Sequence, residues 1–239
     1  MGNQIIIIKN SNTWIEGNAV QQLETTAKLP HIQRVAGMPD LHAGRGYPIG
    51  AAFFSVGHFY PALIGNDIGC GMAFWQTDLP AHKAKISKLV KQLGNIDAPL
   101  DTSWQVRINE LLPQHPFQAA LGTIGGGNHF AELQAVDTVY APEHLPAAFN
   151  PQCLQLLVHS GSRGLGQQIL RRHVDKFSHA GLPENTPEAA AYLAEHDNAL
   201  AFARANRHLI AERMLARWGA DGACLLDVHH NFLQSVQID

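Results

Sequence analysis

Residues 37–75 read GMPDLHAGRGYPIGAAFFSVGHFYPALIGNDIGCGMAFW, and the end of this stretch decides how the rest of the chain is interpreted. The segment 66–72 follows an apolar run and holds a carboxylate and a thiol between glycines. Glycines beside Cys70 remove side-chain bulk and allow positive φ, so a tight bend can bring Asp67 and Cys70 to one point. The pattern favours a metal or nucleophile loop. The alternative is a glycine-rich turn in which Cys70 is a small buried apolar residue.

The composition indicates a globular protein without a strong overall charge. The 239 residues are 46% hydrophobic and 15% charged, with a formal net charge of −3. These values exclude a strongly basic nucleic-acid-binding protein, so any RNA or DNA contact must come from a local patch. The 14 histidines are a large number for this length and favour metal or phosphate binding.

The cysteines and the N-terminus indicate the cellular compartment in which the protein is expected. Cys70, Cys153 and Cys224 are odd in number and far apart, which fits a reducing environment better than a disulfide framework. The opening MGNQIIIIKN lacks the basic region and cleavage site of a secretory signal. No apolar run approaches the roughly 20 residues of a membrane span. We therefore expect a cytoplasmic protein with no membrane segment.

Periodicity and turn residues predict strands and helices in alternation. A buried strand is expected at Ile5–Ile8, and further strands at 31–35, 154–158 and 223–228. Helices are expected at 17–28, 83–93, 187–218, briefly around 108–112, and from near Gln167. No repeat, low-complexity tract or linker marks a boundary, so we predict one domain over residues 1–239.

The longest predicted helix carries a polar residue on its apolar stripe. The stripe consists of Leu193, Leu200, Ala203, Ile210 and Met214. Asn206 falls on the same face, and a polar side chain there needs a partner. It is either a hydrogen-bonded core asparagine or a side chain that points into a site.

Residues with metal-binding side chains stand at the ends of several predicted strands. They are Asp67 with Cys70, then His129, His159, and one of His229 and His230. Carboxylate, thiolate and imidazole together suit a borderline divalent ion such as Mn²⁺, Zn²⁺ or Fe²⁺. At least five donors are enough for two ions bridged by a thiolate. Two-metal centres characteristically serve phosphoryl transfer.

Two glycine-rich segments could hold phosphates next to such a centre. The strand 154–158 runs into the turn 159–164 (HSGSRG) and then into a helix, and a helix N-terminus reached in this way favours anions. Arg163 would add a guanidinium fork for a phosphate. In the segment 121–133, Asn128 and Glu132 lie on one side whether it is a helix or a strand.

Six ordered motifs in this sequence resemble those of the RtcB family of RNA ligases. They are GMPDLH at 37–42, Ile49-Gly50, DIGCGM at 67–72, LGT with GNHF between 121 and 130, HSGSRG at 159–164, and His230-Asn231. The resemblance implies an α+β fold in which β-sheets with flanking helices hold a dinuclear metal site. It also implies a GTP- and Mn²⁺-dependent ligase. Such an enzyme joins an RNA 3′-phosphate or 2′,3′-cyclic phosphate to a 5′-hydroxyl, as in tRNA splicing and RNA repair.

The resemblance assigns roles to individual residues. Cys70 would bridge two Mn²⁺ ions, with Asp67 and His129 completing one shell and His159 and His230 the other. The nucleotide contacts implied are Asn128, Glu132 and Asn231, and the RNA phosphate contacts are Arg163, Ser160 and Ser162.

One departure from the family pattern concerns the catalytic acceptor. Family members continue far beyond the His-Asn motif, and that portion holds the histidine that is guanylylated. We therefore expect a C-terminally shortened ligase whose acceptor lies outside this sequence. Two alternatives are a dinuclear metal-dependent phosphoesterase acting on nucleotides or RNA ends, and an inactive truncated product. The opening residues resemble the shorter RtcB paralogues found beside a release-factor homologue, which implies a partner in the same pathway.

Overall fold

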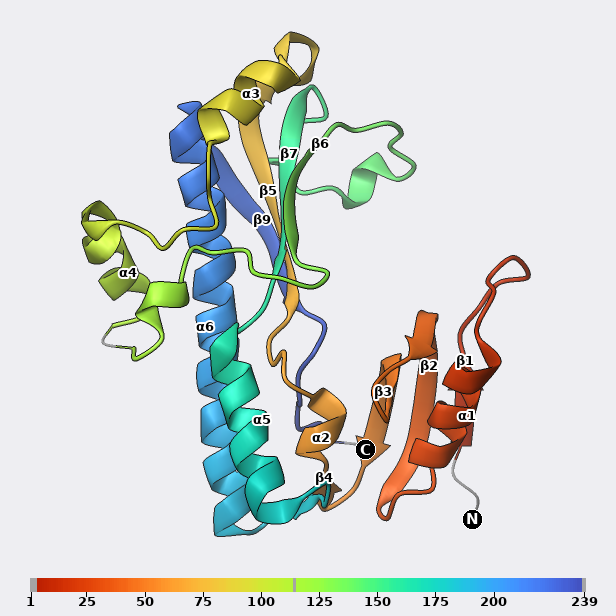
Figure 1. Cartoon of the computed structure of the whole chain (residues 1–239). Coiled ribbons are helices and arrows are strands. Elements are labelled where there is room, and N and C mark those ends of the chain that lie inside the picture. The colour runs from red at the N-terminus through yellow and green to blue at the C-terminus, as the bar shows by residue number, and fades with distance from the viewer. Residues whose placement is uncertain (1–3, 114, 238–239) are drawn as a thin grey trace. The chain divides into compact units, whose positions relative to one another are not determined.

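The computed structural model describes residues 4–113 and 115–237, and it combines helices with separate β-sheets (Figure 1). The chain forms two compact units, one of residues 1–63 with 176–191 and one of 64–175 with 192–239. The α+β class is confirmed. The single domain predicted over residues 1–239 stays a prediction.

The strands are β1 Gln4–Ile7, β2 Ile32–Ala43, β3 Pro48–Ser55, β4 His58–Phe59, β5 Gly71–Pro80, β6 Phe130–Gln134, β7 Cys153–Ser160, β8 Leu182–Pro183 and β9 Gly222–His229. The α-helices are α1 Gly17–Thr26, α2 Pro61–Ile64, α3 Ile86–Leu93, α4 Gln105–Leu111, α5 Gly164–Phe177 and α6 Pro187–Trp218. Short 3₁₀ turns lie at Ala81–Lys83, Thr102–Trp104, Gln118–Ala120 and Pro142–His144.

The first unit is built on a sheet of order β1-β2-β3, in which β1 pairs with β2 in parallel and β2 with β3 antiparallel. The helix α1 packs Leu23 against Val35 and Leu41 of β2. The strand at Ile5–Ile8 was predicted to be buried, and this is wrong: Ile5, Ile6 and Ile8 are 41%, 46% and 48% exposed. The reason is that β1 is an edge strand, which among the described residues pairs with β2 alone.

The second unit is built on an antiparallel sheet of order β6-β7-β5-β9. Neighbouring strands in such a sheet run in opposite directions. The first residues of β6 and β5 and the last residues of β7 and β9 therefore lie side by side, along the edge of the sheet that is formed by strand ends. The register agrees, because Gly71 at the start of β5 pairs with Ser160 of β7 and His229 of β9.

The helix α6 covers one face of this sheet (Figure 1). Its first turn is capped by the Thr186 hydroxyl, which accepts a hydrogen bond from the Ala189 N–H at 3.2 Å. It ends at Trp218 and is followed by Gly219, whose φ is +63°, with the Ala220 N–H donating to the Leu215 carbonyl. This is the glycine-terminated end that a helix favours, and it explains why the predicted bounds 187–218 match the observed ones.

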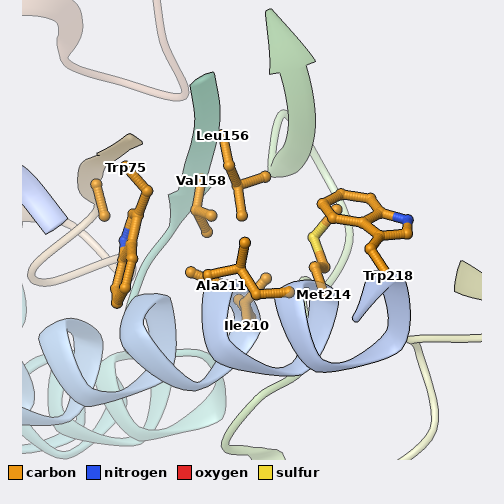
Figure 2. Packing of buried hydrophobic residues seen from close by; sticks show 9 residues of the cluster. Trp75, Leu156, Val158, Ile210, Ala211, Met214 and Trp218 are labelled. Carbon is orange, nitrogen blue, oxygen red and sulfur yellow. The ribbon is translucent and has the colours of Figure 1, made fainter. Parts of the chain in front are cut away.

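Apolar side chains join α6 to the sheet, as Figure 2 shows. Trp75, Leu156 and Val158 of the strands face Ile210 and Met214 of the helix. Each side chain of this kind contributes about 1.5–3 kcal/mol when it is fully buried. This packing fixes the sheet to α6, and the polar residues of the helix are thereby held against the strand ends. Over residues 4–113 and 115–237, no helix has the length and apolar character needed to cross a membrane.

Candidate metal centre

The sheet edge described above brings the candidate donor residues together. Cys70 directly precedes β5 and His129 directly precedes β6. His159 is the next-to-last residue of β7, and His230 directly follows β9. Asp67 lies three residues before Cys70 in the same turn. Four strand ends therefore deliver five donor side chains to one place.

The donor atoms lie within a few ångströms of one another. Cys70 Sγ is 3.1 Å from His159 Nε2, 3.3 Å from His230 Nε2 and 3.6 Å from His129 Nε2. His129 Nε2 is 2.8 Å from Asp67 Oδ2, and His159 Nε2 is 3.3 Å from His230 Nε2. The donor atoms form two groups, Asp67-Cys70-His129 and Cys70-His159-His230, each with all of its atoms within 4.8 Å. Cys70 belongs to both groups.

Backbone carbonyls orient two of the imidazole rings. His129 Nδ1 lies 3.2 Å from the Ile124 carbonyl and His159 Nδ1 lies 2.9 Å from the Asn128 carbonyl. A carbonyl only accepts, so Nδ1 of each ring donates to it and the Nε2 side of each ring faces the cluster. A histidine held in this way is oriented as a metal ligand is.

Burial and neighbouring charge set the protonation of the cluster. Burial raises the pKa of the Cys70 thiol, and the adjacent Asp67 carboxylate raises it further. Burial also raises the pKa of the Asp67 carboxyl, but hydrogen bonds from His129 and Cys70 outweigh it and hold that pKa below its usual value. Burial lowers the pKa of His159. Without a metal the thiol is therefore protonated at neutral pH while Asp67 is ionised.

The turn that carries Asp67 is held by close contacts. The Asn231 amide donates to the carbonyls of Ile64 and Asp67 at 2.8 and 2.7 Å. The Asp67 carboxylate also lies against Gly161, where a Cβ atom would be 2.1 Å from Asp67 Oδ1. Only glycine fits at position 161 while the carboxylate stays in this place.

Comparisons with known proteins decide the family. The sequence model of the family described as "tRNA-splicing ligase RtcB" matches residues 22–110 and 110–239. The RNA-splicing ligase RtcB2 of Escherichia coli is 56% identical over an alignment of 243 positions, which covers 100% of this chain and 63% of the relative. The chain belongs to the RtcB family.

Two further relatives are more distant. The RNA-splicing ligase RtcB of E. coli K12 is 31% identical over 67% of this chain and 44% of its own length. The tRNA-splicing ligase RtcB of Archaeoglobus fulgidus is 31% identical over 82% of this chain and 54% of its own length. The chain thus spans 63% of the length of the RtcB2 relative and about half of the other two.

In this RtcB-family chain, the residues assigned to nucleotide and RNA differ in accessibility. Asn128 and Glu132 are exposed, and Glu132 lies in β6. Arg163 is half-buried and donates from Nε to the Thr123 hydroxyl at 3.4 Å. Its guanidinium lies over Gly125, where a Cβ atom would be 1.6 Å from Arg163 Nη1. Arg163 makes no ion pair with a carboxylate in the described part of the chain, so the guanidinium keeps donors for an anion.

Ser160 and Ser162 are both 0% exposed. The Ser160 hydroxyl donates to the Ile124 carbonyl at 3.0 Å and accepts from the Asn206 amide at 3.0 Å. A side chain with no accessible surface does not reach an RNA phosphate in this conformation. The Ser160 hydroxyl therefore holds the turn, whereas the Ser162 hydroxyl has no hydrogen-bond partner among the described residues. The role of both serines as RNA phosphate contacts stays a prediction.

Asn206 is a hydrogen-bonded core asparagine, which resolves the alternative that the sequence left open. It is 0% exposed, its Oδ1 accepts from the Gly122 N–H at 2.8 Å, and its Nδ2 donates to Thr123 and Ser160. Arg207 on the same helix is also 0% exposed and is not among the residues predicted from the sequence. Its spacing could have revealed it, because Arg207 is four residues after Ala203 and three before Ile210, on the same apolar stripe.

Proposed function

We propose that this chain carries the two-metal centre of a GTP- and Mn²⁺-dependent RNA ligase. The enzyme would join an RNA 3′-phosphate or 2′,3′-cyclic phosphate end to a 5′-hydroxyl end. The observation that carries the proposal is the position of Cys70 in both donor groups, as a thiolate shared by two ions requires. The names of the relatives support RNA as the substrate. A cytoplasmic location, and a release-factor homologue acting in the same pathway, belong to the proposal and rest on the sequence alone.

The donor set fits two borderline divalent ions. Asp67 and His129 would hold one ion, His159 and His230 the other, and Cys70 both. Oxygen, nitrogen and sulfur donors together suit Mn²⁺, Fe²⁺ or Zn²⁺ rather than Mg²⁺ or Ca²⁺. Two bound ions would stabilise the attacking and leaving oxygens of a phosphoryl transfer.

The neighbouring side chains would position the substrates. Arg163 would bind the RNA phosphate with its free donors, since a guanidinium matches the geometry of phosphate oxygens. Asn128 and Glu132 are exposed and would contact the nucleotide, Asn128 its phosphates and Glu132 its base. The Asn231 amide nitrogen is engaged with two carbonyls, so we propose that Asn231 holds the Asp67 turn beside the nucleotide.

Metal and RNA binding test this proposal directly. Titration calorimetry of the metal-free chain with Mn²⁺ should give two ions per chain. Fluorescence anisotropy should then show tighter binding of an RNA oligonucleotide with a 3′-phosphate than of the same oligonucleotide with a 3′-hydroxyl. Arg163→Ala should remove that difference. A chain that binds no Mn²⁺, or that does not distinguish the two RNA ends, would contradict the proposal.

The phosphoesterase alternative predicts a different result in the same preparation. Steady hydrolysis of a 2′,3′-cyclic phosphate with Mn²⁺, lost in Cys70→Ala, would favour a metal-dependent phosphoesterase over a ligase centre. No turnover over a panel of cyclic phosphates and phosphomonoesters would count against it.

Metal binding should release a proton and strengthen as the pH rises. Burial and Asp67 raise the pKa of the Cys70 thiol, so the metal-free protein is protonated there, and only the thiolate is a ligand. One proton released per thiol makes the Mn²⁺ affinity rise about tenfold between pH 7 and pH 8. Calorimetry in buffers of different ionisation enthalpy measures the proton directly. Binding without proton release would show that Cys70 is not a ligand.

A methyl group at Gly161 should weaken metal binding. In Gly161→Ala the new Cβ would lie 2.1 Å from Asp67 Oδ1 and push the carboxylate away from His129. We expect Mn²⁺ affinity to fall about 10–100-fold, as when a supporting contact of a metal ligand is lost. Gly126→Ala is the control, because a Cβ there meets nothing within 4 Å. Equal affinities for the two variants in a Mn²⁺ titration would contradict this role of Gly161.

A further inference from the structure

A buried cation lies behind the donor cluster. Arg207 of α6 is 0% exposed, and Asp227 of β9, its ion-pair partner, has a side chain that is 2% exposed. The pair is joined by Arg207 Nε and Nη2, which donate to Asp227 Oδ1 at 3.1 and 2.5 Å. A buried ion pair costs desolvation free energy and is weak grounds for stability by itself. Stability alone therefore does not explain why this ion pair is buried behind the donor cluster.

The remaining donors of Arg207 reach the segments that carry the metal-binding side chains. Nη1 donates to the Gly69 carbonyl at 2.8 Å and to the Ser160 carbonyl at 2.9 Å. Nη2 lies 3.2 Å from His229 Nδ1. Gly69 directly precedes Cys70, Ser160 directly follows His159, and His229 directly precedes His230. One guanidinium thus contacts the chain next to three of the five donors.

Four of the five N–H donors of the guanidinium have an oxygen acceptor in this arrangement. Arg has five N–H donors in a planar fork. Nε uses one on Asp227, Nη1 uses two on the carbonyls and Nη2 uses one on Asp227, while His229 Nδ1 beside Nη2 itself donates to the Gly69 carbonyl at 3.0 Å. A lysine ammonium presents three donors from a single atom and does not span these directions. The geometry is therefore specific for arginine.

We propose that Arg207, held in place by Asp227, is a positioning residue of the metal centre. It sets the distances of Cys70, His159 and His230 from one another by fixing the three adjacent backbone segments. This inference rests on the proposed function, because it concerns the geometry of the same centre.

The test compares metal affinity with folding stability in the full chain. Arg207→Lys should weaken Mn²⁺ binding about 10–100-fold, and it should weaken the thiolate charge-transfer absorption of the Co²⁺-substituted protein. The control is Arg213→Lys, on the same helix and 5% exposed, whose Nη1 donates to the carbonyls of Ile96, Ala98 and Gly122. None of these carbonyls is adjacent to a donor residue. Arg213→Lys should lower the melting temperature and leave Mn²⁺ affinity within about twofold.

A double variant separates positioning from folding. Arg207→Met with Asp227→Leu removes both charges and leaves side chains of similar shape, so no uncompensated charge is buried and the chain should still melt cooperatively. Its Mn²⁺ affinity should stay low. Wild-type affinity in Arg207→Lys, or in the double variant, would overturn the inference while leaving the two-metal proposal intact. Absence of Mn²⁺ binding by the wild-type chain would overturn both.

Discussion

Replacing Cys70 with alanine should abolish tight metal binding by this chain. Cys70 Sγ lies within 3.1–3.6 Å of His129, His159 and His230 and belongs to both donor groups. Loss of a contact that only supports a ligand costs about 10–100-fold in affinity. Loss of a ligand shared by two ions should lower the affinity for each of the two ions by more than that. Titration calorimetry with Mn²⁺ would show no tight site in Cys70→Ala.

The other cysteines provide the controls. Cys153 at the start of β7 and Cys224 in β9 are also free thiols, and neither belongs to a donor group in the described residues. Cys153→Ala and Cys224→Ala should keep both sites. Alkylation of the metal-free protein should abolish Mn²⁺ binding only when Cys70 is modified. Two intact Mn²⁺ sites in Cys70→Ala would show that the thiol is a core residue, the alternative that its sequence context allowed.

Neutralising Asp227 should be the most destabilising change of a single charge. Asp227→Asn leaves the Arg207 guanidinium buried without its counter-charge, and breaking a buried ion pair from one side costs about 3–5 kcal/mol. The free energy of unfolding should fall by that amount in urea titrations followed by tryptophan fluorescence.

Glu212→Gln is the matched control for Asp227. Glu212 of α6 pairs with Arg107, and both side chains are partly exposed, at 23% and 39%. Water screens such a pair, so its loss should cost only about 1 kcal/mol or less. If the free energy of unfolding fell equally in the two variants, the Arg207–Asp227 pair would be as well solvated as a surface pair. That result would contradict the burial of both side chains.

The sequence predicted the local elements well where local signals mark their bounds. The helix at 187–218 has Pro187 at its first position and Gly219 just past its end. Each residue marks a helix end through its own backbone conformation, which depends only on residues within one turn. The strand 154–158 was recognised from its apolar run but extends to Cys153–Ser160, because pairing with β5 and β6 continues beyond that run. The motifs also identified the family and the α+β class, which are confirmed.

Burial was predicted less well, because it depends on neighbours that are distant in sequence. An apolar run such as Ile5–Ile8 predicts a strand whether it lies at the centre or at the edge of a sheet. Arg207 is the converse case, a charged residue on a buried face. Its partners Gly69, Ser160 and Asp227 are 138, 47 and 20 residues away, so no local pattern announces them.

By itself, the sequence determined which side chains with metal-binding chemistry stand at the ends of its apolar runs: Asp67, Cys70, His129, His159 and His230. Only the tertiary structure decided that these ends meet, because the strand order β6-β7-β5-β9 and its alternating directions place two strand starts and two strand ends at one edge. Strand order arises from long-range pairing and from the packing of α6 on the sheet, and a period of two residues along a strand carries no information about either.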